Sequence, residues 1–180
     1  MSATKYTGSG AIAASDFKYI KYVGKTKGGK SITIEMPKAI CLSNPDWKFA
    51  EKDDTVPEIE FSGVYDDDNL AADDRTEPWT VELADGTTAG NSEILLGVGK
   101  FYIGTSASDA ACVGLTRGGG SFVVERNYRE INADNDPGAV EGRIVQEEGR
   151  PKLKFNALQF ITKIASLYAG MKTVTPGVGG

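Results

Sequence analysis

Residues 23–35 read Val-Gly-Lys-Thr-Lys-Gly-Gly-Lys-Ser-Ile-Thr-Ile-Glu, and residues 113–125 read Val-Gly-Leu-Thr-Arg-Gly-Gly-Gly-Ser-Phe-Val-Val-Glu. Seven of the 13 aligned positions are identical. In both copies a Gly-Gly pair precedes a strand-like run, which is typical of a tight turn entering a β-strand. The repeat therefore predicts turns at Gly28 and Gly29 and again at Gly118 and Gly119, in two related halves of one β-rich chain.

A second pair of similar segments supports the two halves. Pro-Glu-Ile-Glu-Phe at 57–61 corresponds to Pro-Lys-Leu-Lys-Phe at 151–155. Alternating or β-branched stretches predict further strands, at residues 17–23, 31–36, 58–65, 79–83, 94–103 and 152–158. Apolar residues at helical spacing predict one helix over 160–169. The expected fold is mainly β, an antiparallel β-sandwich or barrel with one flanking α-helix, in a single domain of residues 1–180. We expect flexible ends at 1–14 and 173–180, and a linker at 84–91 between the halves.

The composition is that of an ordinary globular chain. The 180 residues carry a net charge of −5, include 22 glycines and have a mean hydropathy of −0.27. An acidic chain lacks the basic surface that phosphate binding requires. No apolar run reaches the roughly 18 residues of a membrane span. Cys41 and Cys112 have no metal-site spacing, so we expect two free, buried thiols.

The chemistry of an enzyme is not apparent. Histidine is absent, which removes the commonest general base and metal ligand. Residues 24–31 satisfy the P-loop pattern, but the residues that follow have strand-like alternation, whereas that motif needs a helix at its Lys-Ser. The acidic residues at 66–74 and 134–136 are expected to be solvated loop acids. We therefore expect no catalytic residues, no cofactor and no metal.

Residues 122–155 are rich in charges of alternating sign. They could form an ordinary solvated sheet face, or a self-complementary face that contacts other copies of the chain. The second interpretation gives six candidate interface residues: Arg126, Tyr128, Arg129, Glu130, Asp134 and Arg143.

This same region resembles the major tail tube proteins of long-tailed bacteriophages. The likeness rests on Ser-Phe-Val-Val-Glu-Arg-Asn-Tyr-Arg-Glu-Ile-Asn-Ala-Asp at 121–134, Gly-Ala-Val-Glu-Gly-Arg at 138–143 and Pro-Lys-Leu-Lys-Phe-Asn-Ala-Leu at 151–158. Segments 31–34, 53–65 and 77–79 extend it, so that it spans about residues 15–170. Asn135 stands where the family pattern usually has glycine.

The resemblance implies a structural virion protein. It implies self-association into hexameric rings that stack into a tail tube, contacts with other phage tail proteins, and a lumen through which DNA passes during ejection without specific binding. It implies synthesis in the cytoplasm of a bacterial host, a final location in the virion tail, and no membrane partner. Relative to the family, the halves are exchanged, which indicates a circular permutation.

Two other functions remain open at this point. The chain could be the inner tube protein of a contractile injection system or of a phage-like bacteriocin, which shares the expected fold. It could also be a nucleotide-binding or carbohydrate-binding β domain, which ligand binding in solution would reveal.

Overall fold

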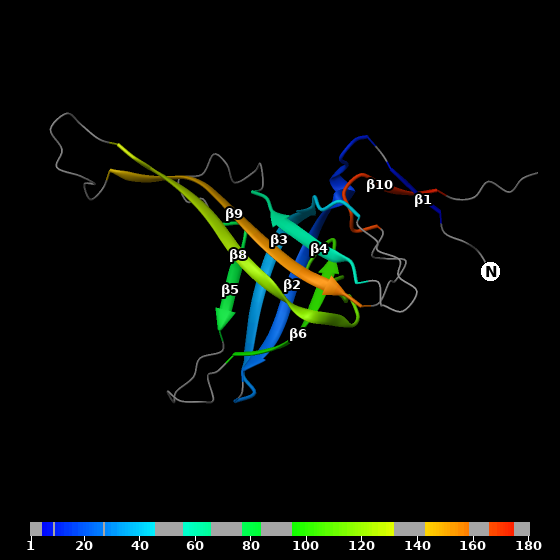
Figure 1. The fold of residues 1–180 in the computed structure, drawn as a ribbon, viewed down its shortest axis with the longest axis horizontal. Helices are drawn as coiled ribbons and strands as arrows, with labels where there is room; N and C mark the ends of the chain where they lie inside the picture. Colours follow the sequence, from blue (N-terminus) through cyan, green and yellow to red (C-terminus); the bar gives the residue numbers. More distant parts are fainter. Residues whose placement is uncertain are drawn as a thin grey trace, which may run out of the picture.

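The computed structural model describes residues 5–8, 10–26, 28–45, 56–65, 77–83, 95–131, 143–158 and 166–174. Antiparallel strands dominate them (Figure 1). The chain forms β1 (Lys5–Gly8), a 3-10 turn η1 (Ala14–Asp16), β2 (Phe17–Thr26), β3 (Ser31–Cys41), β4 (Glu58–Gly63), β5 (Thr80–Leu83), β6 (Leu95–Gly104), β7 (Ala111–Cys112), β8 (Thr116–Glu130), β9 (Ile144–Ala157) and β10 (Met171–Val174). The expectation of a mainly β, antiparallel fold is confirmed.

Eight strands form one antiparallel sheet. Seven of them follow the order β7-β6-β2-β3-β4-β9-β8, and β5 pairs with β3 beside β4. The sheet curls strongly, because Phe101 of β6 stacks on Phe155 of β9 with ring centroids 4.5 Å apart. It does not close, because β7 and β8 remain its two ends. The described strands therefore do not close into a barrel, and the expected sandwich or barrel is not confirmed.

The core lies on the concave side of this sheet. In β9 the residues Leu153, Phe155 and Ala157 are buried, while Lys154 and Asn156 between them are only half-buried. This period of two is the sequence signature of a strand with one face in a core. Aromatic side chains fill much of the interior, and Phe61 stacks on Phe155 at 6.4 Å.

The two Gly-Gly copies adopt different structures. The first is the expected hairpin turn: Gly29 has a φ of 83°, and the Thr26 N–H donates to the Lys30 carbonyl at 2.8 Å. The second lies inside β8, where Gly118 and Gly119 have φ values of 78° and 80°. Pairing with β9 skips there from Thr116↔Ala157 to Gly120↔Phe155. The predicted turn at Gly118 and Gly119 is therefore wrong, because the extra residues form a bulge in a continuous strand.

The second repeated pair meets at the middle of the sheet. Segments 57–61 and 151–155 contribute to β4 and β9, which pair antiparallel with Ile59 opposite Phe155 and Phe61 opposite Leu153. Glu60 lies opposite Lys154 between them, and the two form an ion pair of 2.5 Å. The related halves of the sequence therefore lie side by side at this strand pair.

The expected helix is not present in the described part of its range. Residues 159–165 lie outside the described residues, and 166–170 form turns. Tyr168 is buried and makes an isolated bridge to Cys41, while the Ala169 N–H donates to the Cys41 carbonyl at 3.0 Å. These contacts hold the segment against the end of β3, where helical hydrogen bonds would compete with them.

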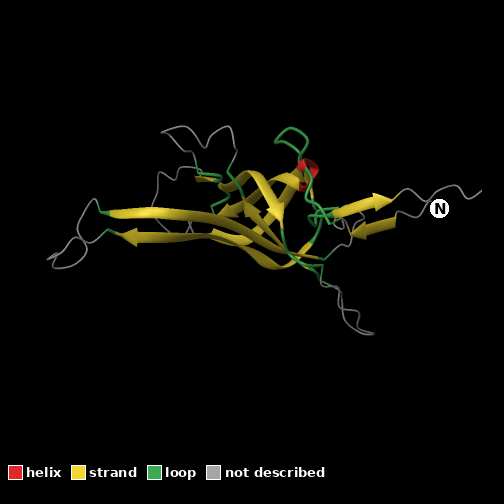
Figure 2. Cartoon of the chain, turned by 90° about the horizontal axis from the view of Figure 1, so that it is seen from above, coloured by secondary structure: helices red, strands yellow, loops and turns green. Residues whose placement is uncertain are grey.

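The two ends of the described chain pair with each other. β1 and β10 form a separate two-stranded ribbon with Lys5 opposite Val174 and Gly8 opposite Met171. These strands lie within or beside the segments expected to be flexible ends, whereas the expected linker at 84–91 lies outside the described residues. The ribbon projects at the end of the molecule opposite to the β8–β9 hairpin (Figure 2).

Candidate subunit interface

The β8–β9 hairpin extends well beyond the sheet. The last residue of β4 that pairs with β9 is Ser62, opposite Lys152. Past that point β8 and β9 continue to pair only with each other, from Glu125↔Arg150 to Glu130↔Ile144. We call residues 125–131 and 143–150 the arm; its paired part has a reach of about 20 Å at the usual rise per residue. Among the described residues it is the most extended projection of the sheet (Figure 1).

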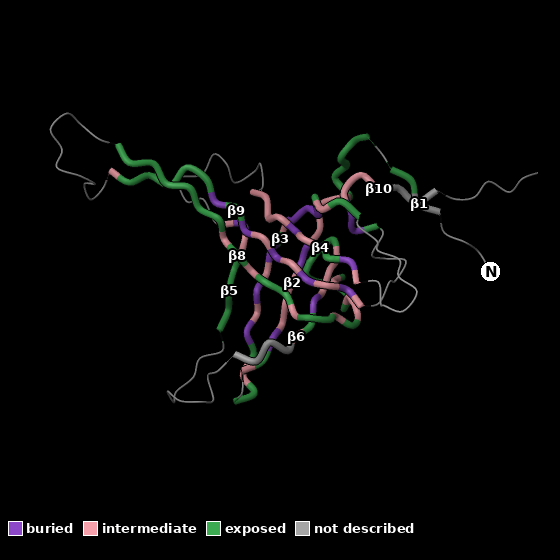
Figure 3. The backbone as a smooth tube through the Cα atoms, viewed as in Figure 1, coloured by how far each residue is buried: buried purple, intermediate pink, exposed green. Residues whose placement is uncertain are grey.

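The arm is exposed on both faces. Gly149 is its only buried residue and Arg143 is half-buried; all the others are exposed (Figure 3). Four exposed side chains are large and apolar: Tyr128 at 58%, Ile131 at 49%, Ile144 at 51% and Val145 at 41%. An isolated two-stranded ribbon has marginal stability in water. A ribbon with apolar residues on both faces is the expected form of a surface that becomes covered on association.

The pairing register divides the arm between two faces. Tyr128 lies opposite Gln146 and Glu130 opposite Ile144, on the face that continues from the core. Arg129 lies opposite Val145 on the other face. A register shift leaves Glu147 unpaired beside Asn127 and Tyr128, which is a second bulge, and bulges increase the local twist. Each face therefore carries apolar and charged side chains together.

Most charges near the arm already have a partner in the same chain. Lys152 contacts Glu125 at 2.8 Å and Arg129 contacts Glu147 at 2.8 Å. Arg150 pairs with Glu148 at 2.5 Å. Exposed pairs such as Arg129–Glu147, with side chains 63% and 50% exposed, contribute little to folding. They remain able to rearrange when a second surface approaches.

The arm contacts the body of the molecule at two points, one near its base and one farther out. The Tyr65 hydroxyl donates to Glu77 at 3.2 Å, and the Gln146 side-chain amide donates to the same carboxylate at 3.5 Å. Arg126 lies 6.0 Å from the centre of the Trp79 ring, in cation–π range. Trp79 packs edge-on against Phe122 at 5.5 Å. These contacts fix the direction in which the arm leaves the sheet.

The structure brings together most of the residues proposed for the interface. Arg126, Tyr128, Arg129 and Glu130 follow one another on β8. Arg143 lies next to them, because the Ile131 N–H donates to its carbonyl at 2.9 Å. Asp134 lies outside the described residues. Their use in contacts between copies stays a prediction.

The sequence reasoning missed the apolar part of this surface. Val123, Ile131, Ile144 and Val145 were not among the candidates, yet all four are exposed large hydrophobic residues. The signal available in the sequence was the adjacent Ile144-Val145 pair. In a half-buried strand only one of two neighbours faces a core.

The P-loop pattern has no phosphate site in this fold. Residues 24–26 end β2, residues 28–30 lie in the hairpin turn, and Ser31 begins β3. Ser31 therefore opens a strand, whereas a phosphate cradle needs the backbone amides of a helix N-terminus. The expectation of a strand after Ser31 is confirmed.

The two cysteines differ. Cys41 is buried and Cys112 is exposed, so the expectation of two buried thiols is wrong for Cys112, which lies on the short edge strand β7. Burial raises the pKa of the Cys41 thiol, which lies 3.6 Å from the Ser43 hydroxyl oxygen. Cys41 is therefore a packing residue that is poorly suited to nucleophilic chemistry.

The described residues contain no group of three or more Cys, Asp or Glu side chains that could hold a metal ion. Within the same part of the chain, no helix is long and apolar enough to cross a membrane. Comparison with protein-family models, with curated proteins and with solved structures found no match. The arm is therefore identified as the candidate site by its own geometry and exposure.

Proposed function

We propose that this chain is a structural subunit that self-assembles into hexameric rings, and that the rings stack into a phage tail tube through which DNA is ejected. The observation that carries the proposal is the open, curled sheet with an exposed arm. An incomplete sheet leaves unpaired strand ends, and copies of the same chain can cover them by pairing around a ring. The number of six comes from the resemblance of residues 15–170 to tail tube proteins.

The arm supplies the contact surface in this proposal. Its four exposed apolar side chains would be removed from water against a neighbouring copy, while Arg129 and Glu130 would set the register. A contact between the arm and a different surface of the next copy is head-to-tail, and such contacts generate rings or filaments. Stacking of rings requires a further contact of this kind along the axis.

The paired chain ends support the proposed circular permutation. β1 and β10 are neighbours, so that joining the ends and opening the chain elsewhere would disturb little. We expect a rearranged chain that begins at Ser92 and joins the present ends by a short glycine linker to fold with the same circular dichroism spectrum. Failure of this variant to fold would count against the permutation.

Electron microscopy of negatively stained, concentrated protein tests the assembly. Rings with six-fold symmetry, alone or stacked into hollow tubes, are the expected result. A particle that stays monomeric at all concentrations would reject the proposed function. Images of a Tyr128→Ser and Ile144→Ser double variant at the same concentration should contain fewer rings, because the variant arm has less apolar surface to bury against a neighbouring copy.

A further inference from the structure

One edge of β8 has no partner strand among the described residues. β8 is 15 residues long and lies at the end of the sheet. Among the described strands only β9 pairs with it. A long unpaired edge is a template for another strand, and proteins normally protect such edges.

The sequence of this edge complements itself when it is reversed about Asn127. In an antiparallel pair centred there, Glu125 lies opposite Arg129 of a second copy and Val123 lies opposite its Ile131. These residues occur at alternate positions and therefore share one face of the strand. On the other face, Arg126 lies opposite Tyr128, a pairing that permits a cation–π contact.

We propose that β8 of one copy pairs antiparallel with β8 of a second copy about a two-fold axis at Asn127, forming a closed dimer with one continuous sheet. The occupant of the open edge is thus the same edge of an identical chain. Each contact occurs twice in such an isologous interface.

The existing ion pairs extend across this interface with the correct signs. Within one copy Lys152 contacts Glu125, and Arg129 contacts Glu147. The two-fold pairing places Glu125 next to Arg129 of the other copy. A row of lysine, glutamate, arginine and glutamate then crosses the dimer with alternating charge, and opposite charges across strands are favourable.

The same register covers exposed apolar side chains. Val123 is 48% exposed and Ile131 is 49% exposed in the single chain. The pairing brings these two together at both ends of the interface. Burial of such side chains is the main favourable contribution to association.

Other registers match less well. In a two-fold antiparallel pair, residues that lie opposite each other point to the same face of the sheet. The two-fold axis must therefore lie at a residue, and an alternative register moves this centre by one residue or more. Centring on Arg126 places Val123 opposite Arg129. Centring on Tyr128 places Arg126 opposite Glu130 but leaves Glu125 opposite Ile131. Of these three centres, Asn127 alone matches charge with charge and apolar with apolar on the face that carries Glu125 and Arg129, although it leaves Glu130 opposite Val124 on the other face.

This dimer goes beyond the proposed tube. A two-fold contact is closed and cannot propagate, whereas a ring requires head-to-tail contacts. Because the ring would use the same arm, the dimer competes with it and holds the chain in a state whose open edge is covered. The balance between dimer and ring then depends on protein concentration.

Charge exchange at Glu125 and Arg129 tests the pairing by analytical ultracentrifugation. Glu125→Arg gives a chain with two positive residues at these positions, and Arg129→Glu gives one with two negative residues. Each variant alone should dimerise about tenfold more weakly than the natural chain, since both two-fold-related pairs become repulsive. An equimolar mixture should recover the dimer, because every charge then meets its opposite.

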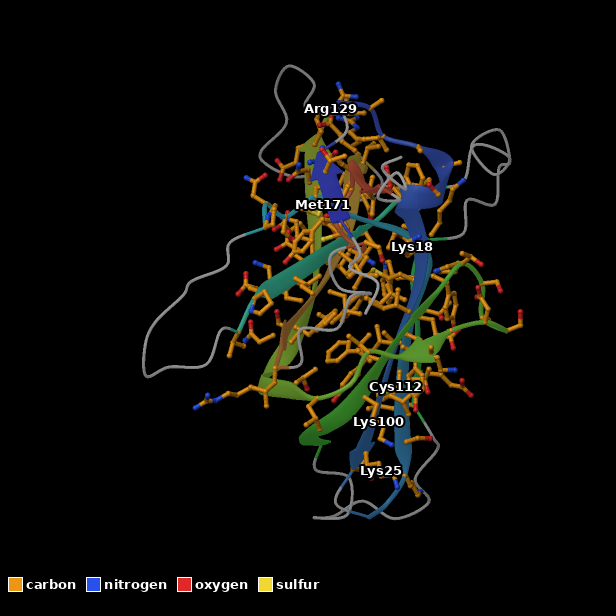
Figure 4. The ribbon with its side chains drawn as sticks, turned by 90° about the vertical axis from the view of Figure 1, so that its right-hand side faces the viewer. Lys18, Lys25, Lys100, Cys112, Arg129 and Met171 are labelled. Carbon is orange, nitrogen blue, oxygen red and sulfur yellow. The ribbon has the colours of Figure 1, made fainter. Side chains whose placement is uncertain are left out.

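Matched controls are Glu82→Arg on β5 and Lys100→Glu on β6, both exposed. Lys100 lies at the end of the molecule away from Arg129 (Figure 4). These variants should dimerise like the natural chain. Dimers that tolerate both arm variants, or a mixture that stays monomeric, would overturn the proposal. Rings in micrographs with no effect of the arm charges would reject the dimer and keep the tube, whereas charge-dependent dimers without rings would do the reverse.

Discussion

In the β8–β9 hairpin, the inner half lies within the sheet and the outer half is the arm. The two strands pair with each other in both halves, but the environments of the halves are opposite. In the sheet, β9 buries Leu153, Phe155 and Ala157 against the core. In the arm, Ile144 and Val145 of the same strand are 51% and 41% exposed. Backbone pairing continues through both halves. Backbone hydrogen bonds therefore define the strands in both parts, whereas packing of the side chains against the core determines where the strands are stable.

The boundary between the halves coincides with specific contacts. β4 stops pairing with β9 at Lys152, the contact of Arg126 with Trp79 follows soon after, and the contact of Gln146 with Glu77 lies farther out along the arm. Past these, nothing in the described chain covers the arm. We therefore expect mutations in the inner half to change folding and mutations in the outer half to change association.

The largest effect on the free energy of unfolding is expected for Phe155→Ala, in the inner half of the hairpin. Phe155 is 1% exposed and stacks on Phe61 and Phe101. Its loss should lower the free energy of unfolding by about 3–5 kcal/mol through lost burial and a residual cavity. Urea denaturation followed by fluorescence measures it. A change as small as that of an arm variant would contradict the assignment of the core.

A second variant tests how closely β8 approaches the core at its bulge, inside the sheet. In Gly120→Ala the new Cβ would lie 2.5 Å from the Lys154 carbonyl oxygen and 2.7 Å from the Phe101 ring. The strand must shift, so we expect a loss of about 1–3 kcal/mol in the free energy of unfolding. Gly10→Ala is the control, because no atom lies within 4 Å of its added Cβ. Equal stability of the two variants would mean that β8 approaches the core less closely.

The ion pair of Lys21 with Glu35 in the sheet predicts that stability depends on pH. Lys21 donates to Glu35 at 2.7 Å in the sheet, and this hydrogen bond lowers the pKa of the Glu35 carboxyl, opposed by burial and assisted by Tyr19. Because the folded pKa lies below the unfolded one, the stabilisation is present above about pH 4.5 and is lost as the pH falls through the folded value. Thermal unfolding from pH 7 to pH 3 should show this loss.

Glu35→Gln is the matched control for that titration. It should remove about 0.2–1 kcal/mol at pH 7, as for other partly exposed pairs, and should flatten the acid limb of the stability curve. The opposite outcome, an unchanged acid limb in the variant, would assign the pH dependence to other carboxylates.

The smallest effect on folding is expected in the arm. Tyr128→Ala should change the free energy of unfolding of the monomer by less than about 0.5 kcal/mol, as is usual for exposed positions. Dilute protein should be used, so that association does not contribute. If the monomer lost as much stability as with Phe155→Ala, the arm would have to be part of the folded core.

Short-range patterns in the sequence predicted much of the fold. The alternation at 31–36 and 152–158 identified β3 and β9, because a strand with one buried face must alternate. The turn predicted at Gly28 and Gly29 was correct, because the hydrogen bond that closes it joins Thr26 and Lys30, which are only four positions apart in the sequence. The turn predicted at Gly118 and Gly119 was wrong. The same glycines tolerate positive φ in a bulge, and pairing with β9, far away in the sequence, decided between the two outcomes.

The candidate site was only partly predictable. The alternating charges indicated Arg126, Arg129 and Glu130 as candidate interface residues, but they could not indicate that β4 ends before the arm begins. Exposure of Ile131 and Val145 follows from that missing neighbour, which is a property of the sheet order. Residues 166–169, the described part of the predicted helix, form turns for a similar reason, because the bridge from Tyr168 to Cys41 joins residues that are distant in the chain.

The ribbon of β1 and β10 determines how the molecule would respond to mechanical force. Lys5 and Val174 lie together at its outer tip, while Gly8 and Met171 lie at its inner end. A pull on both outer residues would unzip this ribbon one residue pair at a time. Because the residue pairs separate one after another, only a small force is needed. The ribbon would therefore open before the force acts on the eight-stranded sheet.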